Sequence, residues 1–332
     1  MSAPAALAPH VAAFGAGRMG RSIAAAYALA GQDFTLIDLR VRTDQAWRRL
    51  QAEVREELQD SFARLLSLGC IDQATAQAAP GRVTLAGRGD APAALAASTL
   101  LFEAVPETLD AKREALEYAG RHAAPGAVIA STSSTMLAGE LASLVPHPER
   151  FLNAHWLNPA YLIPLVEVSP HAGTAPGALE QTLASLKAAG KVPVVCNDKP
   201  GYIVPRLQTL VMNEAARMIE EGTATAADID RAIRYGFGPR YAAMGVVEFI
   251  DFGGLDILYH ASRYLSTRLD PSRYACPQII EDKMQAGELG MKTGQGLYAW
   301  DAQQARHFQQ DALARLVRVL ALDTQAPAPR TK

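Results

Sequence analysis

Short apolar runs alternate with amphipathic stretches over the first two thirds of the chain. The amphipathic stretches include residues 44–68 and 107–122, where apolar side chains recur with helical spacing. Runs that are apolar throughout and alternate with helices are typical of a mostly parallel sheet covered on both faces. We therefore predict a doubly wound α/β domain. Its predicted strands are residues 11–14, 34–38, 83–85, 99–102, 127–130 and 192–195.

The pattern changes after a turn-rich segment at residues 197–201, which reads NDKPG. Beyond this segment the periodicity is helical. We predict three parts: an α/β domain over 1–198, a smaller all-α C-terminal domain over 199–323, and a disordered tail over 324–332, which is rich in alanine and proline. The predicted C-terminal helices are residues 203–221, 226–234, 256–268 and 304–322.

Composition narrows the class of protein. Hydrophobic residues make up 49% of the 332 positions, so the chain can bury a sizeable core. Lysine and arginine number 32 against 34 aspartates and glutamates, and this balance argues against a nucleic-acid-binding protein. The three cysteines are far apart and form no CxxC pair, so we predict neither a disulfide framework nor a metal site. With no signal peptide or membrane span in the sequence, we expect a cytoplasmic protein without a membrane partner.

The first predicted strand ends at a glycine-rich turn. Residues 15–20 read GAGRMG, which fits the dinucleotide fingerprint GxGxxG, and a predicted helix follows directly. The glycines allow a tight turn and a close approach of the backbone to a pyrophosphate, which the helix N-terminus attracts. We therefore predict a Rossmann-type domain; the alternative is a glycine-rich turn without a ligand. The predicted cofactor residues here are Gly15, Gly17, Arg18, Met19 and Gly20.

An acidic residue stands at the end of the second predicted strand. Asp38 lies where a carboxylate accepts a hydrogen bond from the ribose 2′-hydroxyl of NAD and repels the 2′-phosphate of NADP. NAD is therefore the predicted cofactor. Arg40 is near enough in sequence to neutralise a 2′-phosphate, which leaves NADP as the alternative.

Two motifs in the middle of the chain carry a family resemblance. Residues 155–159 read HWLNP and residues 165–168 read LVEV. This arrangement resembles the 3-hydroxyacyl-CoA dehydrogenase family, in which the histidine and the glutamate of HxxNP…LVEV form the catalytic pair. The resemblance covers roughly residues 9–301. Three further segments resemble the same family in the same order: 103–107, 131–135 and 292–298.

The resemblance implies His155 as the catalytic base and Glu167 as its partner, with Asn158 in the same motif. These residue types suit the oxidation of a secondary alcohol, because a neutral imidazole takes up a proton near neutral pH. A carboxylate on the other ring nitrogen then fixes the tautomer and stabilises the imidazolium. Glu167 reaches His155 if the chain doubles back between them. The alternative is a hydrogen-bonded core histidine and a surface glutamate.

The resemblance also assigns roles to residues on two other loops. Ser134 matches the serine that hydrogen-bonds the substrate oxygen, although Ser133 or Ser134 could instead cap a helix that starts at Thr135. Glu107 and Lys112 match residues on the nicotinamide side of the cofactor, and otherwise read as a first-turn acid and a solvated lysine.

The chain departs from the family pattern at three places. Pro205 replaces the asparagine of G-[FY]-[IV]-x-N-R and donates no hydrogen bond. Residues 236–245 are similar to lambda-crystallin, a relative that acts on a free sugar acid. Within this stretch Arg240 either clamps a substrate carboxylate or caps a helix end. Residues 41–101 contain no lysine, where acyl-CoA enzymes often present one to the CoA phosphates; the alternative is that arginines of this segment substitute for it, namely Arg48, Arg49, Arg55 and Arg64.

These observations leave three functions open. The first is oxidation of an (S)-3-hydroxyacyl-CoA in fatty acid metabolism, with NAD as cofactor. The second is the same chemistry on a free 3-hydroxy acid, of gulonate or carnitine type, which Arg240 and Pro205 favour. The third is a non-catalytic NAD-binding or structural protein, which an intact set of His155, Glu167 and Ser134 disfavours. The apolar residues crowded into 203–219 predict a homodimer through the C-terminal domain, as the resemblance also implies.

Overall fold

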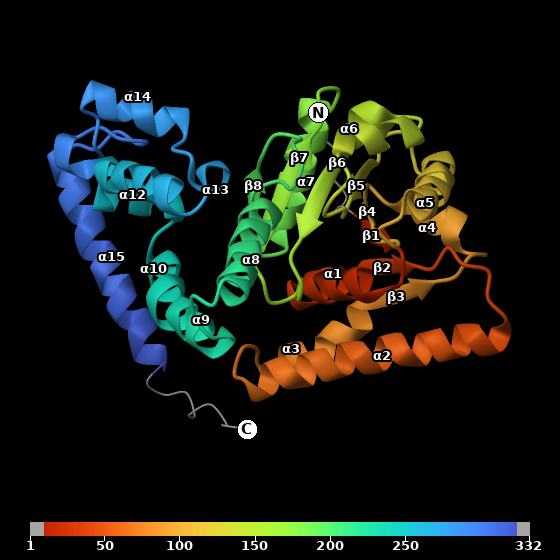
Figure 1. Ribbon diagram of the computed structural model, residues 1–332. Helices are drawn as coiled ribbons and strands as arrows, with labels where there is room; N and C mark the ends of the chain where they lie inside the picture. The colour runs from red at the N-terminus through yellow and green to blue at the C-terminus, as the bar shows by residue number, and fades with distance from the viewer. Residues whose placement is uncertain (1–9, 324–332) are drawn as a thin grey trace, which may run out of the picture. The chain divides into compact units, whose positions relative to one another are not determined.

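The computed structural model describes residues 10–323, so the tail predicted at 324–332 lies outside the described residues. Two compact units divide between Val211 and Met212. The first unit contains an eight-stranded sheet (Figure 1). Its strands are β1 (Val11–Phe14), β2 (Phe34–Ile37), β3 (Val83–Ala86), β4 (Leu100–Glu103), β5 (Val128–Ser131), β6 (Phe151–Trp156), β7 (Leu165–Pro170) and β8 (Val192–Val195).

The strand order is β3-β2-β1-β4-β5-β6-β7-β8. Strands β1 to β6 pair in parallel, and only the β6–β7 pairing is antiparallel. The first six strands therefore have the 3-2-1-4-5-6 order of the Rossmann fold, which confirms the predicted fold class. The order in which strands are added to the sheet reverses between β1 and β4. In such folds, ligands bind beyond the carboxyl ends of the strands at this point.

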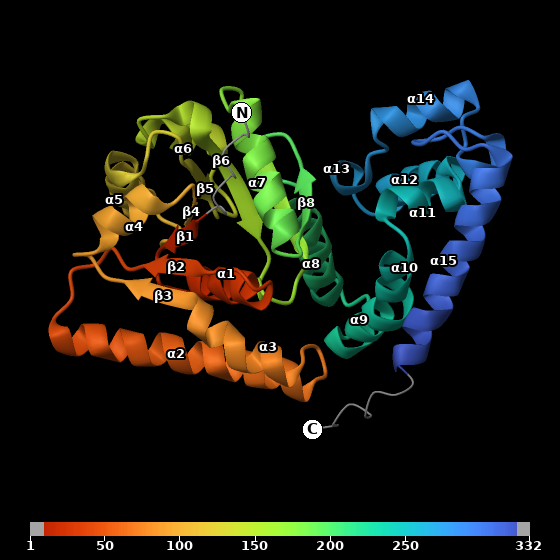
Figure 2. The same cartoon turned by 180° about the vertical axis from the view of Figure 1, so that it is seen from behind.

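Helices cover both faces of the sheet because the strands bury side chains on both sides. Val11 and Ala13 of β1 join a core with α1, α2 and α7, whereas Ala12 and Phe14 join a second core with α4, α5 and α6. Of the first group, α1 and α7 lie in front of the sheet in Figure 2, and α2 is drawn below β3. The helices are α1 (Arg18–Leu29), α2 (Asp44–Ser67), α3 (Gln73–Ala78), α4 (Ala91–Ala97), α5 (Leu109–His122), α6 (Ala138–Leu141) and α7 (Pro176–Ala188).

Helix α8 (Val204–Glu220) runs through the division between the units. The chain ahead of α8 is fixed to the first unit, since Asp198 accepts hydrogen bonds from the backbone N–H groups of Ala138 (2.9 Å) and Gly139 (2.8 Å). These bonds explain why the first unit extends beyond residue 198. The domain boundary at 198/199 stays a prediction.

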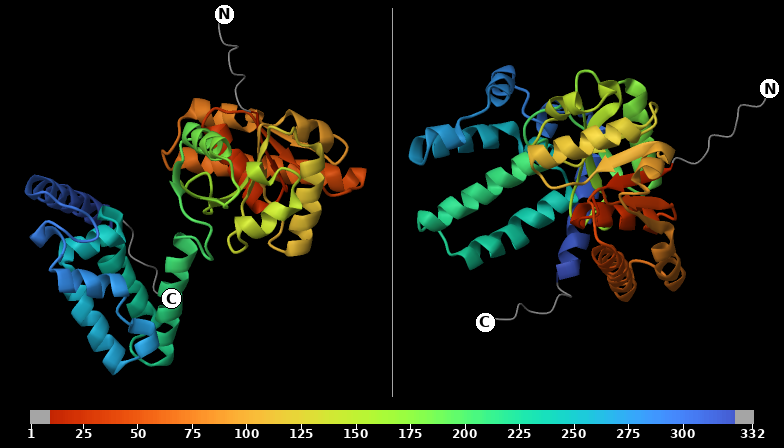
Figure 3. Two further views of the ribbon diagram at one scale, coloured as in Figure 1. Left: turned by 90° about the horizontal axis from the view of Figure 1, so that it is seen from above. Right: turned by 90° about the vertical axis from the view of Figure 1, so that its right-hand side faces the viewer.

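The second unit is helical, as predicted (Figure 3). A π-helical turn, Ile233–Phe237, follows α9 and continues the helical path beyond the predicted end at residue 234. Within the described residues, no helix is long and apolar enough to cross a membrane. The helices after α8 are α9 (Ala226–Ala232), α10 (Gly238–Ala243), α11 (Val246–Gly253), α12 (Leu255–Arg268), α13 (Pro271–Tyr274), α14 (Gln278–Ala286) and α15 (Ala302–Asp323).

Candidate active site

The carboxyl ends of four neighbouring parallel strands bring the predicted site residues of the first unit together. The glycine turn follows β1, Glu107 follows β4, Ser134 follows β5, and His155 lies near the end of β6. Parallel strands end at the same edge of a sheet, so the order β1-β4-β5-β6 sets these segments side by side.

The glycine turn between β1 and α1 fits a dinucleotide. Gly15 has φ +115°, and a Cβ there would lie 2.3 Å from the Ala104 carbonyl oxygen at the end of β4. A Cβ at Gly20 would lie 2.1 Å from the Gly15 carbonyl oxygen. Gly17 is the N-cap of α1 and brings no side chain to its first-turn N–H groups. Open space lies beside Gly17, so a pyrophosphate can approach these donors.

Asp38 is buried at the end of β2 and pairs with two arginines. Arg42 bonds to Oδ2, and the Arg40 Nε lies 3.5 Å from Oδ1. Asp38 thus stands where the ribose is expected, but its charge is neutralised by two guanidinium groups. Sequence reasoning identified Arg40 and missed Arg42.

His155 and Glu167 face each other across the antiparallel β6–β7 pair, which confirms that the chain doubles back between them. His155 Nδ1 lies 2.8 Å from Glu167 Oε2, and both side chains are buried. Because an ionised carboxylate only accepts hydrogen bonds, Nδ1 carries the proton and Nε2 keeps a lone pair. This tautomer is the one that a general base requires.

The second carboxylate oxygen of Glu167 binds the start of α8. Oε1 accepts hydrogen bonds from the backbone N–H groups of Ile203 (2.9 Å) and Val204 (2.8 Å). Glu167 therefore has donors on both oxygens, and the positive end of the α8 dipole stabilises its charge. A helix N-terminus that holds Glu167 was not visible from sequence spacing.

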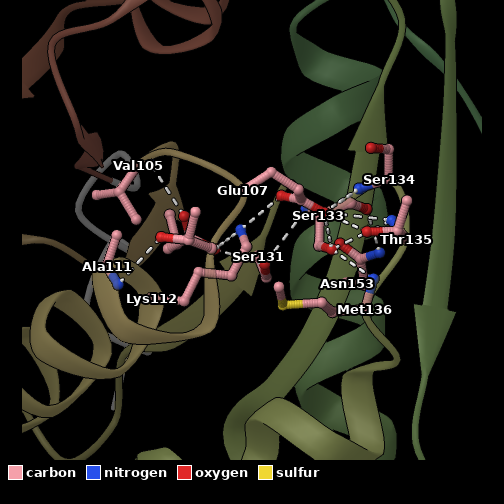
Figure 4. Close-up of polar contacts among 12 residues, drawn as sticks. Val105, Glu107, Ala111, Lys112, Ser131, Ser133, Ser134, Thr135, Met136 and Asn153 are labelled. Carbon is pink, nitrogen blue, oxygen red and sulfur yellow. Dashed lines mark hydrogen bonds and ion pairs between the residues drawn. The ribbon is translucent and has the colours of Figure 1, made fainter.

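Glu107 organises the loop that carries Ser134. Its Oε1 accepts hydrogen bonds from Ser133 Oγ (2.5 Å), from the backbone N–H groups of Ser134 (3.1 Å) and Thr135 (3.2 Å), and from Thr135 Oγ1 (3.0 Å) (Figure 4). Helix α6 begins only at Ala138, so neither serine caps a helix at Thr135. Ser133 instead accepts hydrogen bonds from the N–H groups of Thr135 and Met136.

Lys112 lies behind Glu107 and is fully buried, not solvated. Its Nζ lies 2.7 Å from Glu103 Oε2 and 3.0 Å from Glu107 Oε2. Ser131 Oγ donates a further hydrogen bond to Glu103, at 2.6 Å. Lys112 therefore contacts carboxylates of the protein. Glu107 and Ser131 connect this cluster to the Ser134 loop, since Ser131 Oγ also accepts a hydrogen bond from the Ser133 N–H group at 3.2 Å.

A row of buried polar side chains crosses the sheet beneath this loop. Glu103 of β4 pairs with Ser131 of β5, Ser131 with Asn153 of β6, and Asn153 with Ser169 of β7. All four are fully buried, which is costly unless their polar atoms are hydrogen-bonded. We call these residues the polar row. Asn153 lies two residues before His155, so both side chains point to the same face of the sheet.

The two remaining predicted residues, Asn158 and Arg240, are exposed. Asn158 is exposed and lines a cavity of about 180 Å³ with Arg18, Arg21 and Glu57. Arg240, a predicted substrate residue, belongs to the second unit, where its exposed guanidinium lies 5.8 Å from the Phe249 ring centroid.

The segment 292–298 is held by a buried acid of the second unit. Asp251 accepts hydrogen bonds from the N–H groups of Leu297 and Tyr298 and from Trp300 Nε1, at 2.8–2.9 Å. This motif therefore has a structural role that its resemblance did not reveal.

Comparison with known proteins identifies the family. The family described as "3-hydroxyacyl-CoA dehydrogenase, NAD binding domain" matches residues 10–199, and its C-terminal domain matches residues 201–300. The chain belongs to the 3-hydroxyacyl-CoA dehydrogenase family. It is accordingly an NAD-dependent oxidoreductase that acts on a CH–OH group.

Relatives in this family differ in their named substrates. A lambda-crystallin homolog of Bos taurus is 32% identical over 268 residues, covering 80% of this chain and 80% of the relative. The 5-formyl-3-hydroxy-2-methylpyridine 4-carboxylate 5-dehydrogenase of Mesorhizobium japonicum is 26% identical and covers 93% and 96%. Among solved structures, a 3-hydroxyacyl-CoA dehydrogenase from Archaeoglobus fulgidus has a TM-score of 0.74 at 28% identity, covering 96% of this chain and 100% of that one.

The pairing of Asp38 with arginines predicts how the enzyme selects its cofactor. Asp38→Ala should strengthen NADP binding relative to NAD by about tenfold or more, because Arg40 and Arg42 are then free to bind a 2′-phosphate. Asp33→Ala removes the same charge from an exposed site that pairs with Arg82 and should leave the ratio unchanged. Fluorescence titration of each variant with both cofactors measures the ratio. An unchanged ratio in Asp38→Ala would show that this carboxylate does not select the cofactor.

The Glu107 network predicts a pH dependence of stability. Burial raises the pKa of Glu107, but hydrogen bonds from Ser133 and Thr135 and the charge of Lys112 outweigh it and lower the pKa from 4.5 to about 2. As the pH falls below 4.5, the unfolded chain binds this proton first, so the stabilisation is lost between pH 4.5 and 2. Glu107→Gln should flatten the fall in melting temperature over this range, whereas Glu114→Gln, at an exposed position of α5, should not. Parallel curves for the parent and Glu107→Gln would contradict the assignment.

Proposed function

We propose that this protein oxidises an (S)-3-hydroxyacyl-CoA to the 3-oxoacyl-CoA, with His155 as general base and NAD as hydride acceptor. The observation that carries the proposal is the buried hydrogen bond between His155 Nδ1 and Glu167 Oε2 at 2.8 Å, which leaves Nε2 free to accept a proton. Family membership supplies the reaction class, and several relatives are named for acyl-CoA substrates.

The reaction removes a proton and a hydride from a secondary alcohol. His155 Nε2 takes the hydroxyl proton, and the C–H electron pair leaves as hydride, which the nicotinamide accepts when NAD is bound. Ser134 Oγ donates a hydrogen bond to the substrate oxygen and so holds the hydroxyl beside the base. The imidazolium that forms is stabilised by Glu167, whose position is fixed by the N–H groups at the start of α8.

The glycine turn and Asp38 hold the cofactor in this proposal. Gly15, Gly17 and Gly20 shape the turn, with Arg18 and Met19 in the first turn of α1. Glu107 orients the Ser134 loop beside the nicotinamide, and Lys112 acts through Glu107 because its own side chain is buried. Asn158 belongs to the substrate entrance, since it lines a cavity beside α1 and α2.

A free 3-hydroxy acid is the second candidate substrate. Next to the Asn158 cavity, α2 presents four carboxylates: Glu53, Glu56, Glu57 and Asp60. Arg21, which faces them, is already paired with Glu57 at 2.6 Å. This acidic surface disfavours the phosphate groups of CoA there, because like charges repel. Arg240 is the residue of the second unit that could bind a carboxylate in this alternative.

Variants of the catalytic pair test the proposed function. His155→Asn should lower turnover by about 10²–10⁴-fold with NAD affinity preserved, the usual contribution of a general base. Glu167→Gln should lower turnover by a similar order. The double variant should lower it by far less than the product of the two single losses, because the two residues act as a unit. NADH formation should be measured with 3-hydroxybutyryl-CoA and with free 3-hydroxybutyrate, so that the preferred substrate is decided in the same assay.

The matched control is His122→Asn. This histidine bonds to the Tyr118 carbonyl oxygen on α5, so its loss removes a histidine contact outside the catalytic pair. Turnover should then be retained per folded molecule. Undiminished turnover in folded His155→Asn would refute the proposed base, and no activity of the parent on either substrate would refute the proposed substrate classes.

We also propose a cytoplasmic homodimer that uses the exposed apolar side of α8. Leu210 is 63% exposed and Met212 is 61% exposed, and both lie in the segment whose apolar content predicted a dimer. Light scattering at micromolar concentration should give twice the chain mass of 35.5 kDa. Leu210→Glu should give monomers, whereas Leu68→Glu, at an exposed apolar position on the end of α2, should not. A monomeric parent would contradict the proposal.

A further inference from the structure

Tyr202 has an unusual backbone conformation in the turn before α8. Its φ is +43°, and it is the only residue other than glycine with positive φ among residues 10–323. A bulky side chain in this region is strained, so surrounding contacts must hold it there. Its side chain is buried, with only 5% of the residue exposed. Strained residues of this kind cluster at functional sites.

The hydroxyl of Tyr202 joins the loop after β5 to strand β6. It donates a hydrogen bond to the Met136 carbonyl oxygen at 2.8 Å and accepts one from Asn153 Nδ2. The same Asn153 nitrogen donates to the Ser133 carbonyl oxygen at 2.9 Å. Tyr202 and Asn153 therefore hold the loop 133–136 on its β6 side. Glu107 binds the same loop from the β4 side (Figure 4).

The ring and the backbone of this turn reach the other two members of the site. The Tyr202 ring stacks on His155 with a centroid separation of 5.7 Å and an interplanar angle of 26°. The next two residues donate their N–H groups to Glu167. One short turn thus contacts the base, its carboxylate partner and the loop that carries Ser134.

We propose that Tyr202 is a positioning residue whose hydroxyl sets Ser134 at its working distance from His155. This inference rests on the proposed function, because it assigns Ser134 to the substrate oxygen. Tyr202 is the only residue of the turn 201–205 with a polar side chain, since Pro205 stands where the family has an asparagine. The hydroxyl therefore supplies the side-chain hydrogen bonds that this turn makes to the site. Ser134 lies on an irregular loop, and a shift of about 1 Å in a reacting group can cost 100-fold in rate.

The test compares two variants that each lose one buried tyrosine hydroxyl. Tyr202→Phe keeps the ring on His155 and removes only the bonds to Met136 and Asn153. Tyr27→Phe is the matched control, because the Tyr27 hydroxyl bonds to Ser185 Oγ at 2.9 Å in the core between α1 and α7. Tyr202→Phe should lower kcat about 10- to 100-fold with NAD affinity unchanged. Tyr27→Phe should keep kcat even where its melting temperature falls.

Two further measurements separate positioning from a general loss of stability. In a Ser134→Ala background, Tyr202→Phe should cost almost nothing more in kcat, because the group that it positions is already absent. Hydrogen exchange at the amides of residues 133–136 should be faster in Tyr202→Phe than in the parent, and unchanged in Tyr27→Phe. Asn153→Ala removes the hydrogen bonds from β6 to Tyr202 and to Ser133 and should reproduce both results. It replaces Tyr202→Phe as the test if that variant does not fold.

The exchange measurement needs no substrate, so it distinguishes the two proposals. Faster exchange with an inactive parent would refute the proposed function and support the role of Tyr202 in ordering the loop. Parent-like exchange and turnover in Tyr202→Phe would overturn the inference, as would a full kcat loss that persists in the Ser134→Ala background.

Discussion

The site depends on one buried charge, the carboxylate of Glu167, which is 1% exposed. A buried carboxylate costs several kcal/mol unless donors surround it, so the chain around it is constrained. One oxygen accepts a hydrogen bond from His155 Nδ1, and the other accepts hydrogen bonds from two N–H groups at the start of α8. The antiparallel β6–β7 pair, the position of α8 and the tautomer of His155 all follow from satisfying this group.

A second buried charge cluster fixes the loop opposite the base. Glu103 and Lys112 are both fully buried and pair with each other, and Lys112 also pairs with Glu107. Glu107 then binds the loop that carries Ser134. The polar row connects this cluster to the β6 side of the sheet through its strand pairings. The networks around the proposed base and around Ser134 meet at Tyr202, whose hydroxyl binds the loop and whose ring stacks on His155. Such preorganised groups are how a rigid scaffold stabilises developing charge.

Much of this architecture could be predicted from the sequence, and the rest fails for identifiable reasons. Strands β1 and β8 have the predicted bounds because they are uninterrupted apolar runs between turns. The segments of β6 and β7 were not predicted as strands, because Asn153, His155 and Glu167 interrupt their apolar pattern. The sequence indicated these segments only through the motifs HWLNP and LVEV. The pairing of His155 with Glu167 was predicted from the resemblance of HxxNP…LVEV to the family motif, and the chemistry of an imidazole beside a carboxylate is consistent with it.

The partners contributed by distant segments could not be inferred. Asn153 and Tyr202 act through tertiary contacts that leave no short motif, and Lys112 reads as a solvated lysine until α5 packs on β4. Arg42, by contrast, lies only four residues after Asp38. The most direct test of the account is a structure of His155→Asn with NAD and the preferred hydroxy substrate. The account predicts the substrate hydroxyl oxygen within about 3 Å of both Ser134 Oγ and the side chain at position 155. A hydroxyl bound away from either residue would contradict it.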